Sequence, residues 1–316
     1  PTLSLAQPML VNPPQAQLDD VERHEVPSEL WATSADDIPT LIANLKALHR
    51  GESVYWNPSS PYRIAGAGEP GEDRTAQLER AIKTLEKGSN PDMLRARAIH
   101  FEDSPFDGKL AFCFTGQGSQ YLNMGLDLAE KYPIVANTFK EANEILTPIL
   151  GRPITDYIRW DGGDDREERE EILKQTEYSQ PATLAIDIAI LRLLASYGVY
   201  PDMVAGHSLG EYGAAVAAGV MSFEDSLRAV SARGREMASI QLEDTGKMAG
   251  IATNTQNVEE ILAEVEGYVV PANKNCQTQT VIAGASDAVE EAIERFRARG
   301  FTVYPLPVSH AFHSAI

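Results

Sequence analysis

The sequence predicts an α/β protein, because segments with the alternating apolar pattern of strands take turns with segments whose apolar residues recur at helical spacing. Two further observations define its organisation. A strand, a sharp glycine turn and a helix follow one another around Ser208, and residues 247–306 show the order strand, helix, strand, strand, helix, strand. We therefore expect an N-terminal extension with a small α/β linker unit at 1–108, a large subdomain at 109–246 and 307–316, and a small subdomain at 247–306.

Composition and charge exclude some classes of binding partner. The 316 residues include 27 basic and 46 acidic side chains, a formal net charge of -19. This charge argues against binding to nucleic acid or to an anionic membrane surface. No apolar run reaches the roughly 18 residues of a membrane span, and the N-terminus has no signal pattern, so a cytoplasmic protein is expected. The missing initiator Met indicates a piece of a larger polypeptide.

The N-terminal part shows repeated α/β cycles. Residues 1–27 are rich in Pro, Gln and Asp and are expected to be a linker. Strands are expected at 30–32, 62–65 and 97–101. Helices are expected to follow the first two strands, with apolar residues at helical spacing: Ile38, Leu41, Ile42, Leu45 and Leu48, then Ala76, Leu78, Ile82 and Leu85. This part contains no convergent polar cluster, so we expect it to act as a packing or spacer unit.

A glycine-rich turn follows the next strand. The apolar segment 109–115 runs directly into Gly116–Gln120, and a strand, a glycine turn and a helix together form a layout that binds anions. The glycine spacing matches neither a dinucleotide-binding fingerprint nor a phosphate-binding loop with its Gly-Lys-Ser/Thr. Considered alone, the motif is equally consistent with a structural turn and with a site.

The second glycine turn carries a serine. Apolar residues up to Ala205 precede the pentapeptide Gly206–Gly210, and a helix of small residues follows it. A weakly nucleophilic hydroxyl needs this exposed position on a tight turn, beside a base and near amides that stabilise an oxyanion. The pattern is that of a nucleophile elbow, which predicts an α/β-hydrolase-like large subdomain with Ser208 as a candidate nucleophile.

The remaining elements surround this turn. A long helix is expected to open at Gln180-Pro181-Ala182, since Pro suits a first helical turn. A second helix is expected at 223–240. The strand and helix order of 247–306 is the ferredoxin-like plan, here as an insert, and 307–314 is expected to return to the large subdomain. Cys113 and Cys276 are interpreted as reduced packing residues.

Four stretches together resemble one family. They are Gly116-Gln117-Gly118-Ser119-Gln120, Gln180-Pro181-Ala182, Gly206-His207-Ser208-Leu209-Gly210-Glu211 and His310-Ala311-Phe312-His313. In order and separation they are similar to the acyltransferase domain of type I polyketide synthases, which is related to malonyl-CoA:acyl carrier protein transacylases. The resemblance covers about 109–316, and 29–108 resembles the linker between a ketosynthase and such a domain.

The resemblance implies a role for each matched residue. Ser208 would be the nucleophile and His313 the general base. The backbone amides of Gln117 and Leu209 would form the oxyanion hole. Arg233 would pair with the carboxylate of a malonyl-type substrate, because a planar guanidinium fits a carboxylate bidentately.

Other matched residues would line the same pocket. Gln180 and Met237 have this place in the family, although a helix cap and a core methionine explain them equally well from the residues alone. Phe312 would fill the space of an α-methyl group and so favour malonyl over methylmalonyl. His207 is expected to be a hydrogen-bonding residue beside the nucleophile rather than a second base, and His310 to be structural.

The resemblance also implies substrates and partners. Malonyl-CoA would be the acyl donor, the phosphopantetheine thiol of an acyl carrier protein the acceptor, and a ketosynthase domain a neighbour in the same polypeptide. No cofactor or metal is implied for the chemistry. The family continues past the histidine with a segment that orients it, so the large subdomain is expected to be C-terminally incomplete at Ile316.

Two other functions compete with this interpretation. A serine hydrolase or thioesterase would also use the elbow, with water as acceptor and normally with an acid between nucleophile and histidine. It would give Arg233 no function. A docking module without catalysis would leave Ser208, His313, Gln117 and Arg233 unexplained.

Overall fold

The computed structural model describes residues 30–54, 56–57, 59–67, 72–104, 108–239, 242–306, 308 and 310–316. The linker expected at 1–27 lies outside these residues. The chain divides into two compact units, Pro1–Ala238 and Ser239–Ile316. Each unit has apolar cores of its own.

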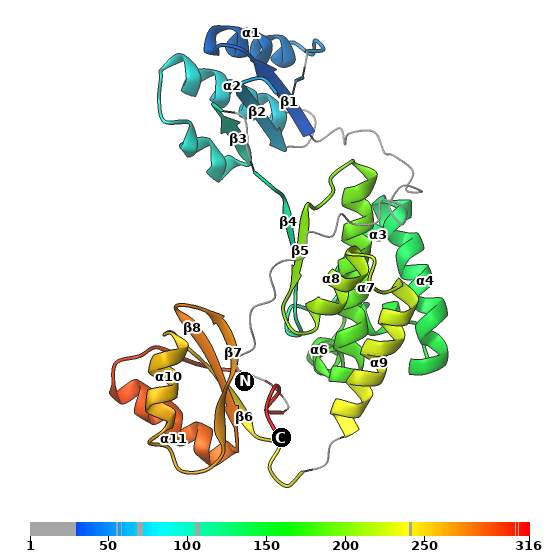
Figure 1. Cartoon of the computed structure of the whole chain (residues 1–316). Coiled ribbons are helices and arrows are strands. Elements are labelled where there is room, and N and C mark those ends of the chain that lie inside the picture. Colours follow the sequence, from blue (N-terminus) through cyan, green and yellow to red (C-terminus); the bar gives the residue numbers. More distant parts are fainter. Residues whose placement is uncertain are drawn as a thin grey trace. The chain divides into compact units, whose positions relative to one another are not determined.

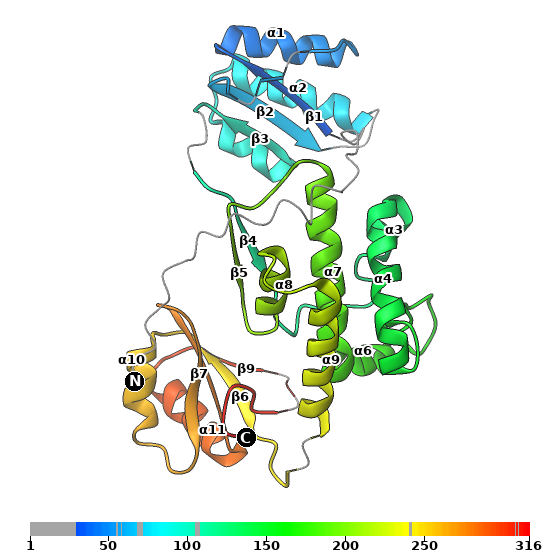
Figure 2. The ribbon, with the colours of Figure 1, turned by 45° about the vertical axis from the view of Figure 1, so that its right-hand side comes forward.

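The N-terminal part of the first unit is an antiparallel sheet with two helices (Figure 1). Its strands β1 (Leu30–Ala35), β2 (Tyr62–Ala67) and β3 (Ile99–Glu102) lie in the order β1-β2-β3. Helices α1 (Ile38–His49) and α2 (Glu72–Glu86) share one apolar core with the strands, and a 3-10 helix at Pro91–Arg97 precedes β3 (Figure 2). The Asp37 side chain begins α1 by accepting a hydrogen bond from the Thr40 amide at 2.7 Å.

The rest of the first unit combines a parallel pair of strands with helices. The elements are β4 (Ala111–Phe114), α3 (Leu126–Lys131), α4 (Pro133–Leu150), α5 (Ile154–Ile158), α6 (Arg166–Lys174), α7 (Thr176–Ser196), β5 (Met203–Gly206), α8 (Gly210–Ala217) and α9 (Phe223–Ser239). Strand β4 pairs with β5 in register from Ala111↔Met203 to Phe114↔Gly206. This pairing places the ends of both strands, and so both glycine turns, at the same edge of the sheet.

Helix α7 is the centre of this core. It lies between α4 and α8 (Figure 1) and is buried around most of its circumference, as expected for a helix that other elements enclose. It begins at Thr176, earlier than the opening expected at Gln180, so Pro181 lies inside the helix. The amides of Tyr178 and Ser179 both donate to the Gln175 carbonyl at 2.9 Å, and this turn forms before the proline is reached. Pro181 removes only one later backbone hydrogen bond.

The two cysteines differ from the sequence-based interpretation. Both are unpaired thiols, but both are exposed rather than packed in a core. Cys113 is on β4, where it is paired in register with Ala205 of β5, and both residues point away from the half-buried Phe112 and the buried Phe114. Alternation along the strand therefore explains the exposed thiol.

The second unit is an antiparallel sheet with two helices on one face. Its elements are β6 (Lys247–Ile251), α10 (Thr255–Leu262), β7 (Val269–Cys276), β8 (Gln279–Gly284), α11 (Ser286–Ala298) and β9 (Val303–Pro305), and the sheet order is β7-β8-β6-β9. Helices α10 and α11 pack on one face of this sheet (Figure 1).

The end of the chain packs within this second unit. Ala311 is buried in a small core with Met248, Val281 and Ala283, and Phe312 packs against the same core. The structure therefore groups residues 310–316 with the second unit, whereas the sequence analysis assigned 307–316 to the large subdomain. The small Ala311 side chain explains the difference, because it fits closely on the sheet face opposite the helices.

The part of the chain that the structure describes contains neither a membrane-spanning helix nor a metal-binding cluster. None of its helices is both long and apolar enough to cross a membrane. No group of three or more His, Cys, Asp or Glu side chains is placed to hold a metal ion.

Candidate active site

Ser208 lies on a strained turn between β5 and α8. Its φ of 53° is in the left-handed region, which an L-residue other than Gly enters at a cost of about 1–2 kcal/mol. The turn is closed by the Gly210 amide, which donates to the His207 carbonyl at 2.9 Å, and the Glu211 amide donates to the Ser208 carbonyl at 3.2 Å. Such strain is typical of functional sites, where surrounding structure holds a residue in an unfavourable conformation.

Glycines make this turn possible. A Cβ on Gly206 would overlap the backbone of Gly210, and a Cβ on Gly210 would overlap the carbonyl of Phe114 at the end of β4. A Cβ on Gly116 would be 2.9 Å from the carbonyl oxygen of His207. The two glycine-rich turns therefore touch, and the candidate nucleophile and the candidate anion-binding turn form one structural feature.

The Gly116–Gln120 turn is braced by its own side chains. The Gln120 Oε1 atom accepts a hydrogen bond from the Gly118 amide at 2.8 Å, and the Ser119 hydroxyl donates to the Gly116 carbonyl at the same distance. Within the described residues, the backbone amides of Gln117 and Leu209 have no protein acceptor. Both amides are therefore available to a ligand.

Side-chain amides connect this turn to two helices. The buried Gln180 of α7 donates through Nε2 to the Gln117 Oε1 atom at 3.3 Å and to the Met237 sulfur at 3.4 Å. The Oε1 atom of Gln180 is buried and has no hydrogen-bond partner among the described residues. An unsatisfied buried acceptor costs about 1–3 kcal/mol, and such a group is typical of a site that binds a ligand. The structure thus brings Gln117, Gln180 and Met237 together.

Arg233 is on α9, one turn before Met237, and is half-buried. Among the described residues it has neither a hydrogen-bond nor an ion-pair partner. Arg228 of the same helix, by contrast, is paired with Glu224 at 2.8 Å. In a chain with 46 acidic side chains, a half-buried arginine without an acid is a candidate anion site.

The other candidate residues lie in the second unit. His313 has a φ of 59° and an exposed side chain, while the amide of its neighbour Ala311 donates to the Thr245 carbonyl at 2.8 Å. The rings of His310 and Phe312 are 6.1 Å apart. The backbone of this segment is therefore anchored to the small sheet, and the anchor presents the His313 side chain at the surface of its unit.

Two residues that touch this site were not predicted. Gly234 follows Arg233, and a Cβ on it would lie 2.6 Å from the carbonyl oxygen of Thr176, the first residue of α7. The Thr176 hydroxyl accepts a hydrogen bond from the Gln117 Nε2 atom at 3.5 Å. A glycine inside a helix is a signal that could have identified Gly234. No sequence signal marks Thr176.

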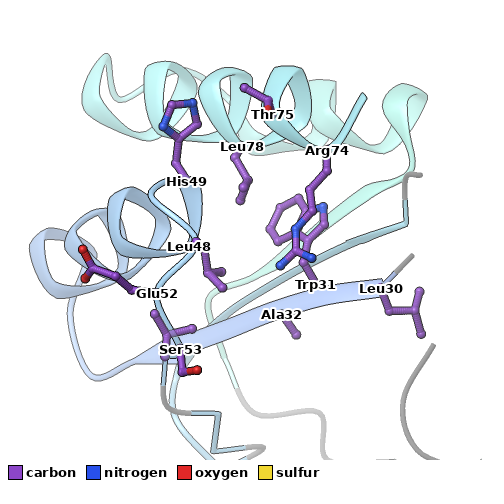
Figure 3. A pocket seen from close by; sticks show the side chains of 12 residues that line it. Leu30, Trp31, Ala32, Leu48, His49, Glu52, Ser53, Arg74, Thr75 and Leu78 are labelled. Carbon is purple, nitrogen blue, oxygen red and sulfur yellow. The ribbon is translucent and has the colours of Figure 1, made fainter. Parts of the chain in front are cut away.

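A separate pocket of about 570 Å³ lies in the N-terminal part (Figure 3). Trp31, Leu48 and Leu78 line it, and two of its polar side chains have partners: His49 is 3.3 Å from Glu79, and Glu52 is paired with Arg50. In Figure 3 the carboxylate of Glu52 points away from the apolar lining. This pocket is less suited to acyl chemistry than the turn at Ser208.

The chain is similar to known acyltransferases and polyketide synthases. The acyl transferase domain family matches residues 111–316. Polyketide synthase GfsA from Streptomyces halstedii is 38% identical over 296 residues, which are 90% of this chain and 4% of that protein. The malonyl CoA-acyl carrier protein transacylase of Bacillus subtilis is 39% identical over 213 residues, 66% of this chain and 64% of that protein.

A solved structure adds the fold. The acyltransferase domain from the second module of the salinomycin polyketide synthase is similar with a TM-score of 0.66 and 32% identity, over 85% of this chain and 58% of that chain. The chain therefore spans less than two thirds of the length of these relatives, and only a small fraction of the synthase. The family match covers more than half of this chain and confirms the resemblance first seen in its four motifs, so the chain belongs to the acyl transferase domain family.

Proposed function

We propose that the protein loads an extender unit, malonyl in preference to others, from coenzyme A onto the phosphopantetheine thiol of an acyl carrier protein. The Ser208 hydroxyl oxygen attacks the thioester carbonyl, His313 accepts the hydroxyl proton, and coenzyme A leaves as the thiol with that proton. The carrier thiol then attacks the serine ester, and the proton it loses returns through His313 to the Ser208 oxygen. An ester and a thioester are exchanged, so no redox cofactor is needed.

The strained turn at Ser208 is the observation that carries this proposal. The backbone amides of Gln117 and Leu209, which have no protein acceptor among the described residues, support it as well. Preorganised amide donors stabilise the negative oxygen of a tetrahedral intermediate, and loss of one such donor costs about 10²–10³ in rate in a well-studied hydrolase. These two amides are the proposed oxyanion hole.

Arg233 and Phe312 are the proposed determinants of the preference for malonyl. Arg233 would bind the free carboxylate of the acyl group, with Gln180 beside it, because nothing else in the described part of the chain neutralises this guanidinium. Phe312 would occupy the space of an α-methyl group. One methyl group changes selectivity by about 1–3 kcal/mol, so methylmalonyl is expected to load more slowly rather than not at all.

The wider assembly follows from the relatives. We propose an α/β-hydrolase-like large subdomain and a ferredoxin-like small subdomain. The antiparallel order β7-β8-β6-β9 supports the latter. An acyl carrier protein is the proposed acceptor, and a ketosynthase domain in the same polypeptide is proposed because polyketide synthases are among the relatives.

Intact-protein mass spectrometry after brief exposure to malonyl-CoA, methylmalonyl-CoA or acetyl-CoA tests the proposal. A malonyl adduct is expected to form fastest, to be absent from Ser208→Ala, and to transfer to an added carrier protein thiol. Ser89→Ala, at an exposed serine of the N-terminal part, is the control for loss of a hydroxyl that is not the nucleophile. Its adduct is expected to form.

Two outcomes contradict the proposal. An adduct that persists in Ser208→Ala excludes Ser208 as the nucleophile. An adduct that is lost to water at the same rate with and without carrier protein identifies a hydrolase instead.

A further inference from the structure

Thr176 contacts two parts of the candidate site from opposite sides. Thr176 is 3% exposed, and its hydroxyl accepts the hydrogen bond from the side-chain Nε2 atom of Gln117 at 3.5 Å. Its backbone carbonyl lies against Gly234 of α9. One residue at the start of α7 therefore touches both the turn that offers the Gln117 amide and the helix that carries Arg233.

The contact at Gly234 leaves no room for a side chain. A Cβ there would be 2.6 Å from the Thr176 carbonyl oxygen, 3.0 Å from the Glu177 Cα and 3.1 Å from the Thr176 carbonyl carbon. All three are backbone atoms and cannot rotate away, so a larger residue would force the helices apart. Glycine inside a helix costs roughly 0.5–1 kcal/mol relative to alanine, and close packing of α9 on α7 accounts for its presence.

A second contact lies one turn further along α9. Met237 receives the hydrogen bond from Gln180 of α7 at 3.4 Å, three residues after Gly234. Two contacts at successive turns define both the separation and the rotation of α9 against α7. Arg233 immediately precedes Gly234 on the same helix, so its position relative to the Gln117–Gln180 pair depends on the Gly234 contact.

We propose that Thr176 and Gly234 are positioning residues that couple the Gln117 turn to the Arg233 helix. The Thr176 hydroxyl orients Gln117 for transfer of any acyl group, whereas the absence of a side chain at Gly234 places Arg233 for acyl groups that carry a carboxylate. This inference rests on the proposed acyltransferase function and adds selectivity determinants that contact no substrate.

The test measures the rate of Ser208 acylation against the concentration of malonyl-CoA and of acetyl-CoA. Gly234→Ala is expected to raise the half-saturating concentration of malonyl-CoA about tenfold to a hundredfold, because small misplacements of a binding group have effects of this size, and to leave acetyl-CoA nearly unchanged. Thr176→Val is expected to lower the maximal acylation rate about tenfold for both donors, so that the ratio of the two rates stays the same. Thr176→Ser is expected to keep the original maximal rates.

Matched variants control for loss of stability. Gly250→Ala adds the same methyl group in β6, where it would meet Tyr304 at ordinary distances of 3.8 Å and 3.9 Å. Thr183→Val removes another buried hydroxyl of α7, one that donates only to the Ser179 carbonyl of its own helix at 2.8 Å. Both variants are expected to acylate as the unmodified protein does, and thermal unfolding of all variants shows which are folded.

The outcomes separate this inference from the proposed function. If neither thioester acylates the unmodified protein, the proposed function fails and the inference fails with it. Two results show that the residues are merely structural and that the inference is wrong, provided that the unmodified protein loads malonyl. One is that Gly234→Ala slows acylation by malonyl-CoA and by acetyl-CoA equally. The other is that Thr176→Ser acylates as slowly as Thr176→Val. Should Gly234→Ala not fold, the Thr176 pair decides alone, because only one of its members keeps the hydroxyl.

Discussion

Charge placement at single residues determines what the site can hold. Ser208, the proposed nucleophile, is a neutral side chain on a left-handed turn, and Arg233 is a half-buried cation without an acid among the described residues. A planar guanidinium that already had a carboxylate partner would add nothing to substrate binding. Its availability is therefore the residue-scale basis of the proposed preference for an acyl group that carries a free carboxylate.

The Arg233→Ala variant tests this basis. Malonyl loading is expected to fall by about tenfold or more, because a charged hydrogen bond contributes about 1.5–3 kcal/mol, while acetyl loading is retained or improved. The measurement is the ratio of the two adducts by mass spectrometry. Arg228→Ala on the same helix removes an exposed guanidinium paired with Glu224 and should leave the ratio unchanged. Equal loss of both adducts in Arg233→Ala would contradict a role in carboxylate binding.

At the scale of elements, α7 connects the core to the site. Its first turn supplies Thr176 and Gln180, and its later turns are buried among other helices. The helix also carries Asp187, where burial raises the pKa of the carboxyl to about 7. Burial favours the neutral acid, so this residue reduces stability when it is ionised.

Asp187 therefore predicts a pH dependence of stability. The pKa is about 7 in the folded protein and 3.8 in the unfolded chain, so between these values the folded state binds more protons and the free energy of unfolding falls as pH rises. Asp187→Asn should be the more stable protein at pH 8, by roughly 1–4 kcal/mol, and the two proteins should converge near pH 4. Urea unfolding at both pH values measures this. A stability difference independent of pH would contradict the raised pKa.

At the scale of the whole molecule, the chain has two units with separate cores. The first contains the Ser208 turn and the second contains the His313 segment. Phe296 of α11 is fully buried in the second unit, where its ring packs edge-on against Phe301 with centroids 6.0 Å apart. Its removal should therefore affect that unit first.

Phe296→Ala is expected to destabilise the second unit by about 3–5 kcal/mol, the usual cost of deleting a buried aromatic ring. Hydrogen exchange should show reduced protection in β6, β8 and α11, with α4 and α7 close to their original protection. Leu146→Ala, a fully buried change in α4, is the reciprocal control. Equal loss of protection throughout the chain would show that the units do not unfold separately.

Local sequence patterns were sufficient to predict a structural feature when one short segment forms that feature by itself. The glycines around Ser208 predicted its turn, because only residues without a Cβ fit that approach of strand and helix. Strand and helix order was also readable from periodicity in residues 30–101 and 247–306, whereas helices α3 to α6 were not predicted. The start of α7 was not, because Pro181 looked like a first-turn residue while the preceding turn had no distinctive signal.

Contacts between distant segments required the folded chain. Thr176 contacts both Gln117 and Gly234, and these three residues belong to segments with no shared periodicity. The contact of Thr176 with Gly234 is between backbone atoms, so no side-chain type predicts it. The packing of Ala311 within the second unit likewise depends on the shape of a sheet face. The amino-acid order therefore predicted the type of chemistry, through residue types at short spacing. Three-dimensional packing determined which distant residues contact the candidate site, because such contacts depend on steric fit across long sequence separations.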